Sequence, residues 1–600
     1  MPFGAELVDD GGTRFRLWAP DAAHVGLRIE VGPAAGTHPM DRLVDGWHEL
    51  TLAQAGAGTR YRYVLPDGLV VPDPASRWNP DDVAGPSVVV DPASYAWRDT
   101  GWRGRPWREA VVYELHVGCY TPDGTFEAAA ARLAELAALG ITAIELMPVA
   151  DFPGRRGWGY DGVLLFAPDA AYGPPDALKA FVDRAHELGL MVLLDVVYNH
   201  FGPEGNYLHA YASPFFNARH RTPWGAAINF DAAGSATVRD FYLHNALMWL
   251  HEYHFDGLRL DAVHAIRDSS ATDIVGAIAL AAAPLRRERH VHLVLENHAN
   301  EADRLAATPE PQGRHVDAQW NDDFHHAAHV ILTGERDGYY VDYAERPVEQ
   351  LGRALAEGYV YQGEPSPFMD GRPRGQPSAR LPSTAFVAFL QNHDQIGNRA
   401  FGDRLAASAV PQRIEAMLAC LLLGPQIPML FMGEEYAATT PFLYFCDFHG
   451  ELADAVRNGR RREFARSAAF ADAASQIPDP NAASTFDAGK LNEAERTQPA
   501  QAARLALVRR LLALRRTHLW PLLPLAAGRS TSTRHVLAVD WSIDGRPVWH
   551  LRANFGSLPQ PFARPPGATT VHAALAIENR SELTLEPDGV WIAAGMERPQ

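Results

Sequence analysis

The spacing of hydrophobic and polar positions changes along the chain. In the first hundred residues, short runs alternate between apolar and polar side chains, separated by turns rich in Gly, Pro and Asp. The clearest run has apolar side chains at Val25, Leu27, Ile29 and Val31. Alternation with a period of two is typical of strands that bury one face. We therefore expect a small N-terminal β-sandwich over residues 1–100.

Beyond the Gly- and Arg-rich stretch DTGWRGRP, apolar residues recur at helical spacing between short apolar runs. An alanine-rich helix is expected from Phe126 to Gly140, before ITAIELMPV, and another from Leu178 to Gly189, before LMVLLDVV. Helices that alternate with buried strands are typical of parallel α/β folds. No glycine-rich phosphate fingerprint follows an early strand, so a (β/α)8 TIM barrel over residues 106–525 is favoured over a dinucleotide-binding sheet.

The end of the chain returns to strand-like patterns. An Arg-rich helical stretch ends near Trp520. After it, apolar and polar residues alternate in the runs HVLAVDWSI and PVWHLRANF, which are accompanied by Gly and Pro turns. We therefore expect a small C-terminal β domain over residues 530–600. The predicted fold class is α/β, with a catalytic barrel that carries insertions and a helical extension between two β domains.

Composition narrows the possible partners and the compartment. A formal charge of -18 disfavours attraction to nucleic acid or to an anionic membrane surface, and a neutral substrate fits better. Three distant cysteines without a CxxC pair indicate neither a disulfide framework nor a cysteine zinc site, which favours a reducing cytoplasm. The N-terminus lacks a basic segment followed by an apolar stretch, so neither secretion nor membrane anchoring is expected.

Polar residues end four of the predicted strands, where a barrel of this type places its active site. The segments are LLDVVYNH, GLRLDAVH, LVLEN and FLQNHD. In the second segment Arg259 and Asp261 are two residues apart and so project to one face of the strand. An arginine beside a carboxylate favours its ionised form, which suits a nucleophile, so we assign that role to Asp261.

Glu296 ends the apolar run VHLVLE, and its burial there would raise the pKa of the carboxyl group. A protonated carboxyl is what a departing glycosidic oxygen requires, so Glu296 is predicted to be the general acid and base. An ionised and a protonated carboxyl group together are the requirement of retaining glycosidases. One such carboxylate alone would more often be a solvated strand end or part of a structural ion pair.

Two other polar clusters have alternative interpretations. The histidines of QWNDDFHHAAH, which are His325, His326 and His329, have helical spacing and could bind metal. We instead expect a helix near the cleft whose polar groups bond neighbours or sugar hydroxyls, with no metal and no cofactor. The basic run AVRNGRRREF is interpreted as a solvated helix face rather than a nucleic-acid patch.

The four strand-end segments, in this order, resemble the four motif regions of the alpha-amylase superfamily of glycoside hydrolases. FRLWAPDAAHV is similar to that superfamily's N-terminal β-sandwich, and VVYELHVGCYTPDGTF is similar to the beginning of its barrel. The resemblance implies Asp394 as a third catalytic carboxylate, which holds hydroxyls of the distorted sugar. It also implies that Arg259 orients Asp261, and that His200 and His393 hydrogen-bond the sugar.

The resemblance further implies that Tyr160 stacks beneath the sugar and that Asp195 lies beside the cleft. Within the superfamily, EGYVYQGEPSPFMDGRPRG, QNHDQIGNRAFGDRL and LFMGEEYAATTPFLYFCDFHGELADAVRNGRRREF resemble maltooligosyltrehalose trehalohydrolases. That family cleaves the α-1,4 bond next to a terminal α,α-trehalose, so the implied partners are maltooligosyl trehalose and related α-1,4-glucans. Candidates for contacts to the trehalose end are Trp320, Asp322, Asp323 and Glu434. A monomer is expected.

Two competing functions remain open on the sequence. A branching enzyme, another α-glucan transglycosylase or an amylase would use the same catalytic residues, because the acceptor subsites decide whether water or a sugar takes the intermediate. A non-catalytic glycan-binding protein would be expected to have lost at least one of the three strand-end carboxylates.

Overall fold

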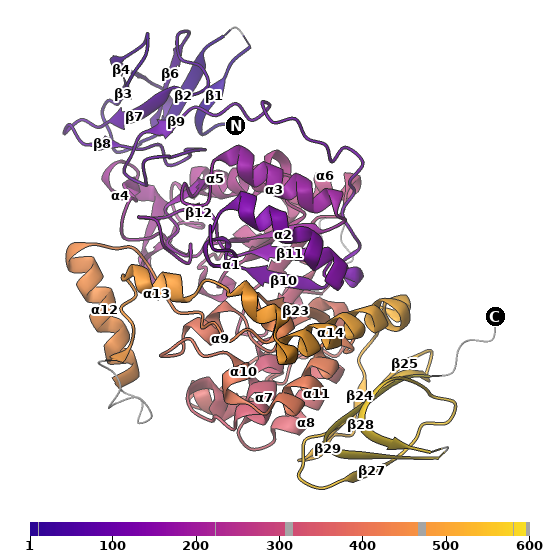
Figure 1. Ribbon diagram of the computed structural model, residues 1–600. Helices are drawn as coiled ribbons and strands as arrows, with labels where there is room; N and C mark the ends of the chain where they lie inside the picture. Colours follow the sequence, from indigo (N-terminus) through magenta and orange to yellow (C-terminus); the bar gives the residue numbers. More distant parts are fainter. Residues whose placement is uncertain (10, 223, 307–315, 466–475, 580, 596–600) are drawn as a thin grey trace.

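A computed structural model describes the chain from residue 1 to 600, apart from residues 10, 223, 307–315, 466–475, 580 and 596–600. Two N-terminal sheets, a central barrel and a C-terminal sheet follow one another across the molecule, with the first and last groups at opposite ends of the barrel (Figure 1). The predicted fold class is therefore confirmed. Among the described residues, no helix has both the length and the apolar character needed to cross a membrane.

The N-terminal region consists of two antiparallel sheets packed face to face. One sheet has the order β1-β2-β6-β5, and these strands are Gly4–Leu7, Thr13–Trp18, Trp47–Leu52 and Asp41–Arg42. The other has the order β4-β3-β7-β8, with strands Gly36–Pro39, Gly26–Ile29, Arg60–Val64 and Val70–Val71, and with β9 (Ser87–Val88) beside β7. The rings of Phe15 and Tyr61, one from each sheet, meet with centroids 4.8 Å apart. Leu27 and Ile29 are buried as the alternation predicts, but Val31 is exposed.

Eight parallel strands form the closed barrel, in sequence order. They are β10 (Val112–Leu115), β11 (Ala143–Leu146), β14 (Met191–Val196), β17 (Gly257–Leu260), β18 (His292–Leu295), β19 (Ala318–Trp320), β22 (Phe386–Ala388) and β23 (Ile427–Phe431). The first strand pairs in parallel with both the second and the last, which closes the barrel. The carboxyl ends of all eight strands therefore meet at one face.

Helices surround the barrel on the outside (Figure 1). They include α2 (Phe126–Leu139), α3 (Pro175–Glu187), α5 (Ser235–Leu247), α6 (Ile274–Glu288), α7 (Asp322–Thr333), α8 (Pro347–Glu357), α11 (Pro411–Leu422) and α14 (Pro499–Leu514). The helix predicted from Phe126 is capped at its N-terminus by Thr125, whose hydroxyl accepts a hydrogen bond from the Ala128 amide. It ends before Gly140, whose φ of 111° is rarely adopted by other residues. Both alanine-rich and amphipathic helices thus lie where the sequence pattern places them.

Most of the remaining elements are inserted between the barrel strands, and two of the helices follow the last strand. These elements are α1 (Val117–Tyr120), α4 (Leu208–Tyr211), α9 (His393–Gly397), α10 (Leu405–Ser408), α12 (Gly450–Ala465), α13 (Ala483–Ala488) and the strand pairs β12–β13 (Ala150–Asp151, Leu164–Pro168), β15–β16 (Phe216–Thr222, Gly225–Ile228) and β20–β21 (Pro365–Ser366, Arg372–Pro373). The basic run predicted to be helical forms most of α12.

The C-terminal sheet is antiparallel and packs against barrel helices. Its strands are β24 (Arg529–Ser530), β25 (Val536–Ile543), β26 (Arg546–Asn554), β27 (Gln560–Ala563), β28 (Thr569–Glu578) and β29 (Glu582–Ala594). Trp549 is fully buried and donates its indole hydrogen to the Leu423 carbonyl just after α11, at 2.9 Å. The fully buried Arg515 donates to three carbonyl oxygens at the end of α11 and in the turn before β23, those of Leu422, Gly424 and Gln426.

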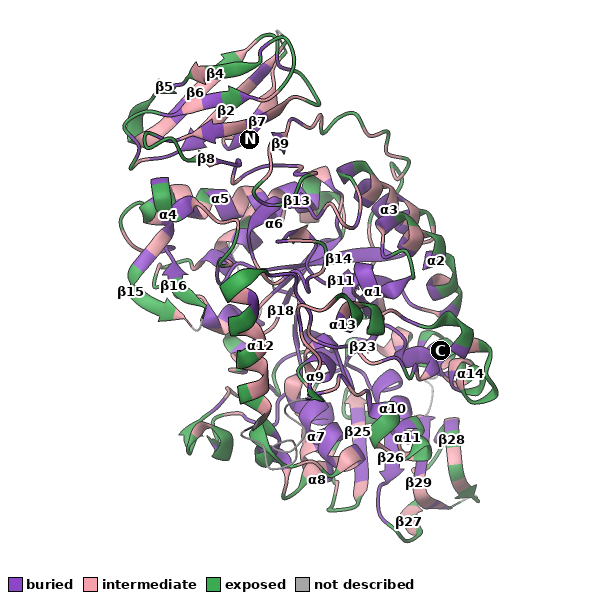
Figure 2. Cartoon of the chain, turned by 60° about the vertical axis from the view of Figure 1, so that its left-hand side comes forward, coloured by how far each residue is buried: buried purple, intermediate pink, exposed green. Residues whose placement is uncertain are grey.

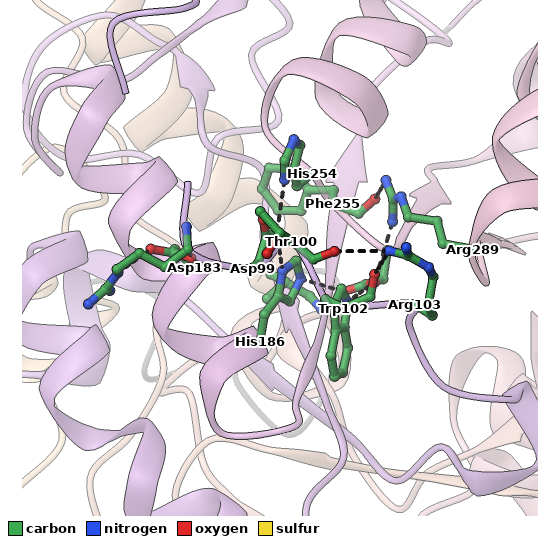
Figure 3. Close-up of polar contacts among 12 residues, drawn as sticks. Asp99, Thr100, Trp102, Arg103, Asp183, His186, His254, Phe255 and Arg289 are labelled. Atoms are coloured by element: carbon green, nitrogen blue, oxygen red, sulfur yellow. Dashed lines mark hydrogen bonds and ion pairs between the residues drawn. The ribbon is translucent and has the colours of Figure 1, made fainter. Parts of the chain in front are cut away.

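An extended linker joins the N-terminal sheets to the barrel and is bound to it by side chains (Figure 3). His186 of α3 lies between two carboxylates, 2.8 Å from Asp99 of the linker and 2.9 Å from Asp256 just before β17. The ring of Trp102 stacks on His186 with centroids 4.7 Å apart and donates its indole hydrogen to Asp256 at 2.7 Å. His254 also bonds Asp99, at 2.8 Å. We call these five residues the linker clasp.

Candidate active site

A cleft of about 820 Å³ opens at the carboxyl-end face of the barrel. Strand-end residues form its floor, and inserted segments form its walls. Six of the residues singled out from the sequence line it, namely Tyr160, His200, Asp261, Glu296, His393 and Asp394. The structure therefore brings together side chains that lie as far as 234 positions apart in the chain, Tyr160 and Asp394 being the extremes.

Arg259 is the fully buried cation beneath the cleft. Its Nη1 donates to Asp261 Oδ1 at 2.7 Å and to Asp195 Oδ2 at 2.7 Å. The guanidinium carbon lies 4.0 Å from the centre of the Trp320 ring, which supports the planar group from below. This arrangement fixes the Asp261 carboxylate beside a permanent positive charge.

Asp261 is held from a second side by Asn199, which follows β14. The Asn199 amide donates to Asp261 Oδ2 at 2.7 Å and to the Asp261 carbonyl at 2.9 Å. The next residue, Ala262, has a φ of 43°, a left-handed conformation that is costly for a residue with a side chain. This turn directs the Ala262 amide at Glu296 Oε2, 2.5 Å away.

Glu296 follows β18 and faces Asp261 across the Arg259 side chain, whose Nη2 lies 3.8 Å from Glu296 Oε2. Burial raises the pKa of Glu296 to about 8; the charge of Arg259 opposes the rise and the charge of Asp261 adds to it. At neutral pH this carboxyl group is therefore largely protonated, although it is bonded within the same network as Asp261.

Tyr160, His200 and Asp195 form one side of the site. Tyr160 donates its hydroxyl to Asp195 Oδ2 at 2.5 Å, and Nε2 of His200 lies 2.9 Å from the Tyr160 carbonyl, to which it can donate. Burial raises the pKa of Asp195 to about 6, against the opposing charge of Arg259. Asp195 does not line the cleft; it is buried below Tyr160 and holds both Tyr160 and Arg259.

His393 and Asp394 begin α9, a helix opened by a capping box in which Asn392 and Gln395 satisfy each other's backbone amides. The cap directs both side chains into the cleft at the end of β22. The His393 ring lies against the Tyr160 ring, with centroids 5.1 Å apart and planes 24° apart. His393 and Asp394 themselves approach to 3.5 Å between Nε2 and Oδ1.

The four candidates for the trehalose end lie in different surroundings. Trp320 is buried under Arg259, and Asp323 is a buried acceptor for the amides of Val360 and Tyr361. Glu434 is buried in the turn after β23, where it accepts from the Phe431 amide at 3.1 Å. These three side chains do not line the cleft.

Asp322 differs from these three because it is partly exposed at the start of α7. Burial raises the pKa of Asp322 to about 7, and the neighbouring charge of Asp394 adds to the rise. The charges of Asp322 and Asp394 therefore interact, although Asp322, like the other three candidates, is not among the residues that line the cleft.

Two of the three histidines for which metal binding was considered have hydrogen-bond partners in the protein, whereas Nδ1 of His326 is buried without one among the described residues. His325 contacts the Leu390 carbonyl at 2.7 Å and the Tyr340 hydroxyl at 3.1 Å, while His329 bonds Glu335 at 2.8 Å. Burial lowers the pKa of His325 and His326 well below the usual range. In the part of the chain that the structure describes, no group of three or more His, Cys, Asp and Glu residues is arranged to hold a metal ion.

The sequence pattern did not single out several residues of the cleft walls. Trp224 is half exposed on the β15–β16 hairpin and stacks on His200 with centroids 4.7 Å apart. Leu452 and Val456 of α12 line the opposite part of the cleft, and α12 lies in front of the barrel strands in Figure 2. These residues come from insertions without a strand-end signal, so only a three-dimensional structure could place them.

The fold and the site define a glycoside hydrolase of the alpha-amylase type. Residues 98–246 match the family model for the alpha amylase catalytic domain, and residues 2–73 match carbohydrate-binding module 48, the isoamylase N-terminal domain. The malto-oligosyltrehalose trehalohydrolase of Deinococcus radiodurans is 43% identical over 590 residues, which cover 96% of this chain and 94% of that protein. The chain belongs to the malto-oligosyltrehalose trehalohydrolase family.

Two further relatives agree with this assignment. The enzyme of the same name from Rhizobium sp. strain M-11 is 44% identical over 530 residues, covering 86% of this chain and 87% of its own length. The crystal structure of an alpha-amylase-like protein from Salmonella typhimurium superposes with a TM-score of 0.93 at 47% identity and covers 99% of each chain. The family resemblance inferred from the sequence motifs is confirmed.

Proposed function

We propose that this protein hydrolyses the α-1,4-glucosidic bond next to the terminal α,α-trehalose of maltooligosyl trehalose and releases trehalose. The names of the relatives that match almost the whole chain support the choice of substrate. The observation that carries the chemistry is the pairing of Asp261, which is bonded to Arg259, with Glu296, whose pKa burial raises to about 8. One carboxylate and one carboxylic acid in a single cleft are what a retaining mechanism needs.

In the first step, Glu296 gives its proton to the glycosidic oxygen on the trehalose side while an Asp261 oxygen attacks the anomeric carbon. The bond to trehalose breaks, trehalose leaves with the proton, and the glucan remains bound to Asp261 as a glycosyl ester. Arg259 and Asn199 hold Asp261 for this attack through their bonds to separate carboxylate oxygens. In the second step, Glu296 takes a proton from water, the water oxygen attacks the same carbon, and Asp261 is released.

The other candidate residues bind the sugar in this proposal. Tyr160 stacks under the reacting ring, and His200, His393 and Asp394 hydrogen-bond its hydroxyls, since all four line the cleft. Asp195 supports Tyr160 and Arg259 from below. Asp322, whose charge interacts with that of Asp394, is the remaining candidate for a contact to the trehalose unit. No cofactor takes part, and we retain the expectation of a monomer in a reducing cytoplasm.

The substrate is tested by incubation with maltooligosyl trehalose and, separately, with soluble starch, followed by chromatography for trehalose, reducing ends and new branch points. We expect trehalose release together with weak action on plain maltooligosaccharides. New α-1,6 branches, or efficient starch cleavage without trehalose release, would instead establish a branching enzyme or an amylase. The nucleophile is tested by trapping with a fluorinated glucosyl substrate and mass spectrometry, in which a label on a residue other than Asp261 would contradict its role.

A further inference from the structure

We propose that Glu114, a residue of the first barrel strand, is a positioning residue that holds His393 as a charged imidazolium in the cleft. The proposal rests on the proposed function, because it concerns the same site. Glu114 does not line the cleft and so acts on the sugar only through His393. Its role would be to fix both the orientation of the His393 ring and its protonation state.

Both oxygens of Glu114 are directed at one residue. Oε1 lies 2.5 Å from His393 Nδ1, and Oε2 accepts from the His393 backbone amide at 3.2 Å. The Glu114 side chain is about 1% exposed, and the part of the chain that the structure describes offers its carboxylate no other hydrogen-bond donor. A buried carboxylate with a single partner has its charge compensated mainly by that partner.

Aromatic rings fix the His393 imidazole in this orientation. Tyr160 stacks on it, and Trp158 meets it edge-on with centroids 5.4 Å apart and planes 90° apart. With Nδ1 engaged by Glu114, the second nitrogen, Nε2, is the one that lies 3.5 Å from Asp394. The ring therefore links the carboxylate of the first strand to the carboxylate of α9.

The charge of His393 follows from all the groups around it. Burial opposes the charged form, and so does Arg259 from β17; Glu114 from β10 and Asp394 from α9 favour it, and together they raise the pKa of His393 to about 9. Glu145 from β11 and His116 also face this region. Burial raises the pKa of Glu145 well above its usual value and lowers that of His116 to about 4, so both groups are uncharged near neutral pH.

The charge matters because it decides what Nε2 can do. A neutral imidazole that donates from Nδ1 to Glu114 leaves Nε2 as an acceptor only, whereas an imidazolium donates from both nitrogens. A donor at Nε2 can bond a sugar hydroxyl oxygen or Asp394 without depriving Asp394 of its negative charge. Glu114 thereby keeps a hydrogen-bond donor in the cleft over the pH range in which Glu296 is protonated.

The neighbouring strand supplies a matched control. Glu145 is paired with Glu114 across β10 and β11 and is equally buried, with 1% exposure for each residue. Its Oε1 has no hydrogen-bond partner among the described residues, and its carboxyl group is neutral for the reason given above. Glu145→Gln therefore changes the composition of the barrel interior without removing a charge, whereas Glu114→Gln removes one.

The experiment is the pH dependence of kcat/KM for wild type, Glu114→Gln, Glu114→Asp and Glu145→Gln. In the wild type, we expect the titration of Glu296 to set the upper limb near pH 8. In Glu114→Gln the imidazole loses its proton first, so we expect that limb to move down by at least about one pH unit, with kcat/KM at pH 8 reduced about 10-fold or more. The upper limb of Glu114→Asp should lie between those of wild type and Glu114→Gln. The pH profile of Glu145→Gln should match that of the wild type. An unchanged upper limb in Glu114→Gln would overturn the proposal.

A second arm needs no substrate and separates this inference from the proposed function. Because the folded state raises the pKa of His393, its stabilisation is complete below about pH 6.5 and is lost as the pH rises through about 9. The Tm difference between wild type and Glu114→Gln should therefore be large at pH 6 and small at pH 10, and a difference independent of pH would contradict the proposal. If Glu114→Gln does not fold, Glu114→Asp decides by the same criterion. Wild type that leaves maltooligosyl trehalose intact would refute the function but not this arm.

Discussion

Arg259 offers one positive charge to three carboxyl groups. It bonds Asp195 and Asp261 directly at 2.7 Å and approaches Glu296 only to 3.8 Å. Burial raises the pKa of Glu296 to about 8 but that of Asp195, which bonds Arg259 directly, only to about 6. Burial and distance from the guanidinium together therefore decide which of these two carboxyl groups keeps its proton at neutral pH.

We expect Glu296→Gln to lower kcat for maltooligosyl trehalose by about 10² to 10⁴-fold, because the glutamine cannot protonate the leaving oxygen. A glucosyl fluoride needs no proton on its leaving group, so the variant should form the Asp261 ester from it at close to the wild-type rate. Quenched-flow kinetics with both substrates would measure the difference. Equal losses on the two substrates would mean that Glu296 is not the acid.

Most of the residues at the base of the cleft could be predicted because they follow strand ends, and a parallel barrel gathers strand ends by its topology. The sequence could not separate residues that point into the cleft from residues that follow the same strands but turn away. Asp323 and Glu434 are buried acceptors for backbone amides, which no local pattern reveals. Trp224 was not predicted, because it belongs to a hairpin inserted between barrel elements.

Helix α12 shows the same limit at the level of an element. The basic run predicted a helix with a solvated face, and arginines such as Arg457 pair with acidic neighbours near the surface. The other face contributes Leu452 and Val456 to the cleft. Arg460 joins the helix to the end of α9 by donating to the Gly397 carbonyl at 2.6 Å. A helix for which the sequence pattern predicted only a solvated face therefore also forms a wall of the candidate active site.

We expect Leu452→Asp to raise KM for maltooligosyl trehalose several-fold and to leave kcat within about two-fold, since the side chain lines the cleft from α12 rather than from a strand end and contributes apolar contact area. Ala455→Asp on the exposed face of the same helix is the matched control and should leave both constants unchanged. Steady-state kinetics of the two variants would decide. A loss confined to kcat would argue against a wall that binds the glucan.

Arg515 supports the junction of the barrel with the C-terminal sheet. It has no acidic partner among the described residues; burial lowers its pKa to about 9, and its hydrogen bonds go to three carbonyl oxygens. Arg515→Met would leave those buried acceptors without donors, at a cost of about 1–3 kcal/mol for each unsatisfied group. We expect a clear fall in Tm by calorimetry. The exposed neighbour Arg516→Met should unfold at the wild-type temperature.

For the whole molecule, the order of the three regions could be predicted from the sequence, but their docking could not. The linker clasp brings Asp99, His186 and Asp256 together from positions up to 157 residues apart, and each is ordinary in its local sequence. Burial opposes the charged form of His186, yet the charges of Asp256 and Asp99 outweigh it and raise the pKa of this histidine. The N-terminal region is thus bound to the barrel by a contact that depends on pH.

We expect the Tm difference between wild type and His186→Gln to be largest near pH 6 and to shrink in alkaline solution. The pKa of His186 is raised in the folded state, so its stabilisation is complete below the ordinary value of 6.5 and disappears as the pH rises through the raised pKa. Thermal unfolding from pH 6 to pH 10 would measure the change. The exposed His209→Gln serves as a control, and a constant Tm difference for His186→Gln would contradict a charged clasp.

The pairing of the first barrel strand with the last one has a consequence for how activity returns during refolding. His393 and Asp394 follow the seventh strand, and Glu114 on the first strand holds His393. The site therefore exists only in a chain whose two barrel ends have met through β10 and β23. During refolding, hydrolysis should therefore return only when the barrel closes, and not when helices and strands first form. The far-ultraviolet circular dichroism signal should recover before the enzymatic activity does.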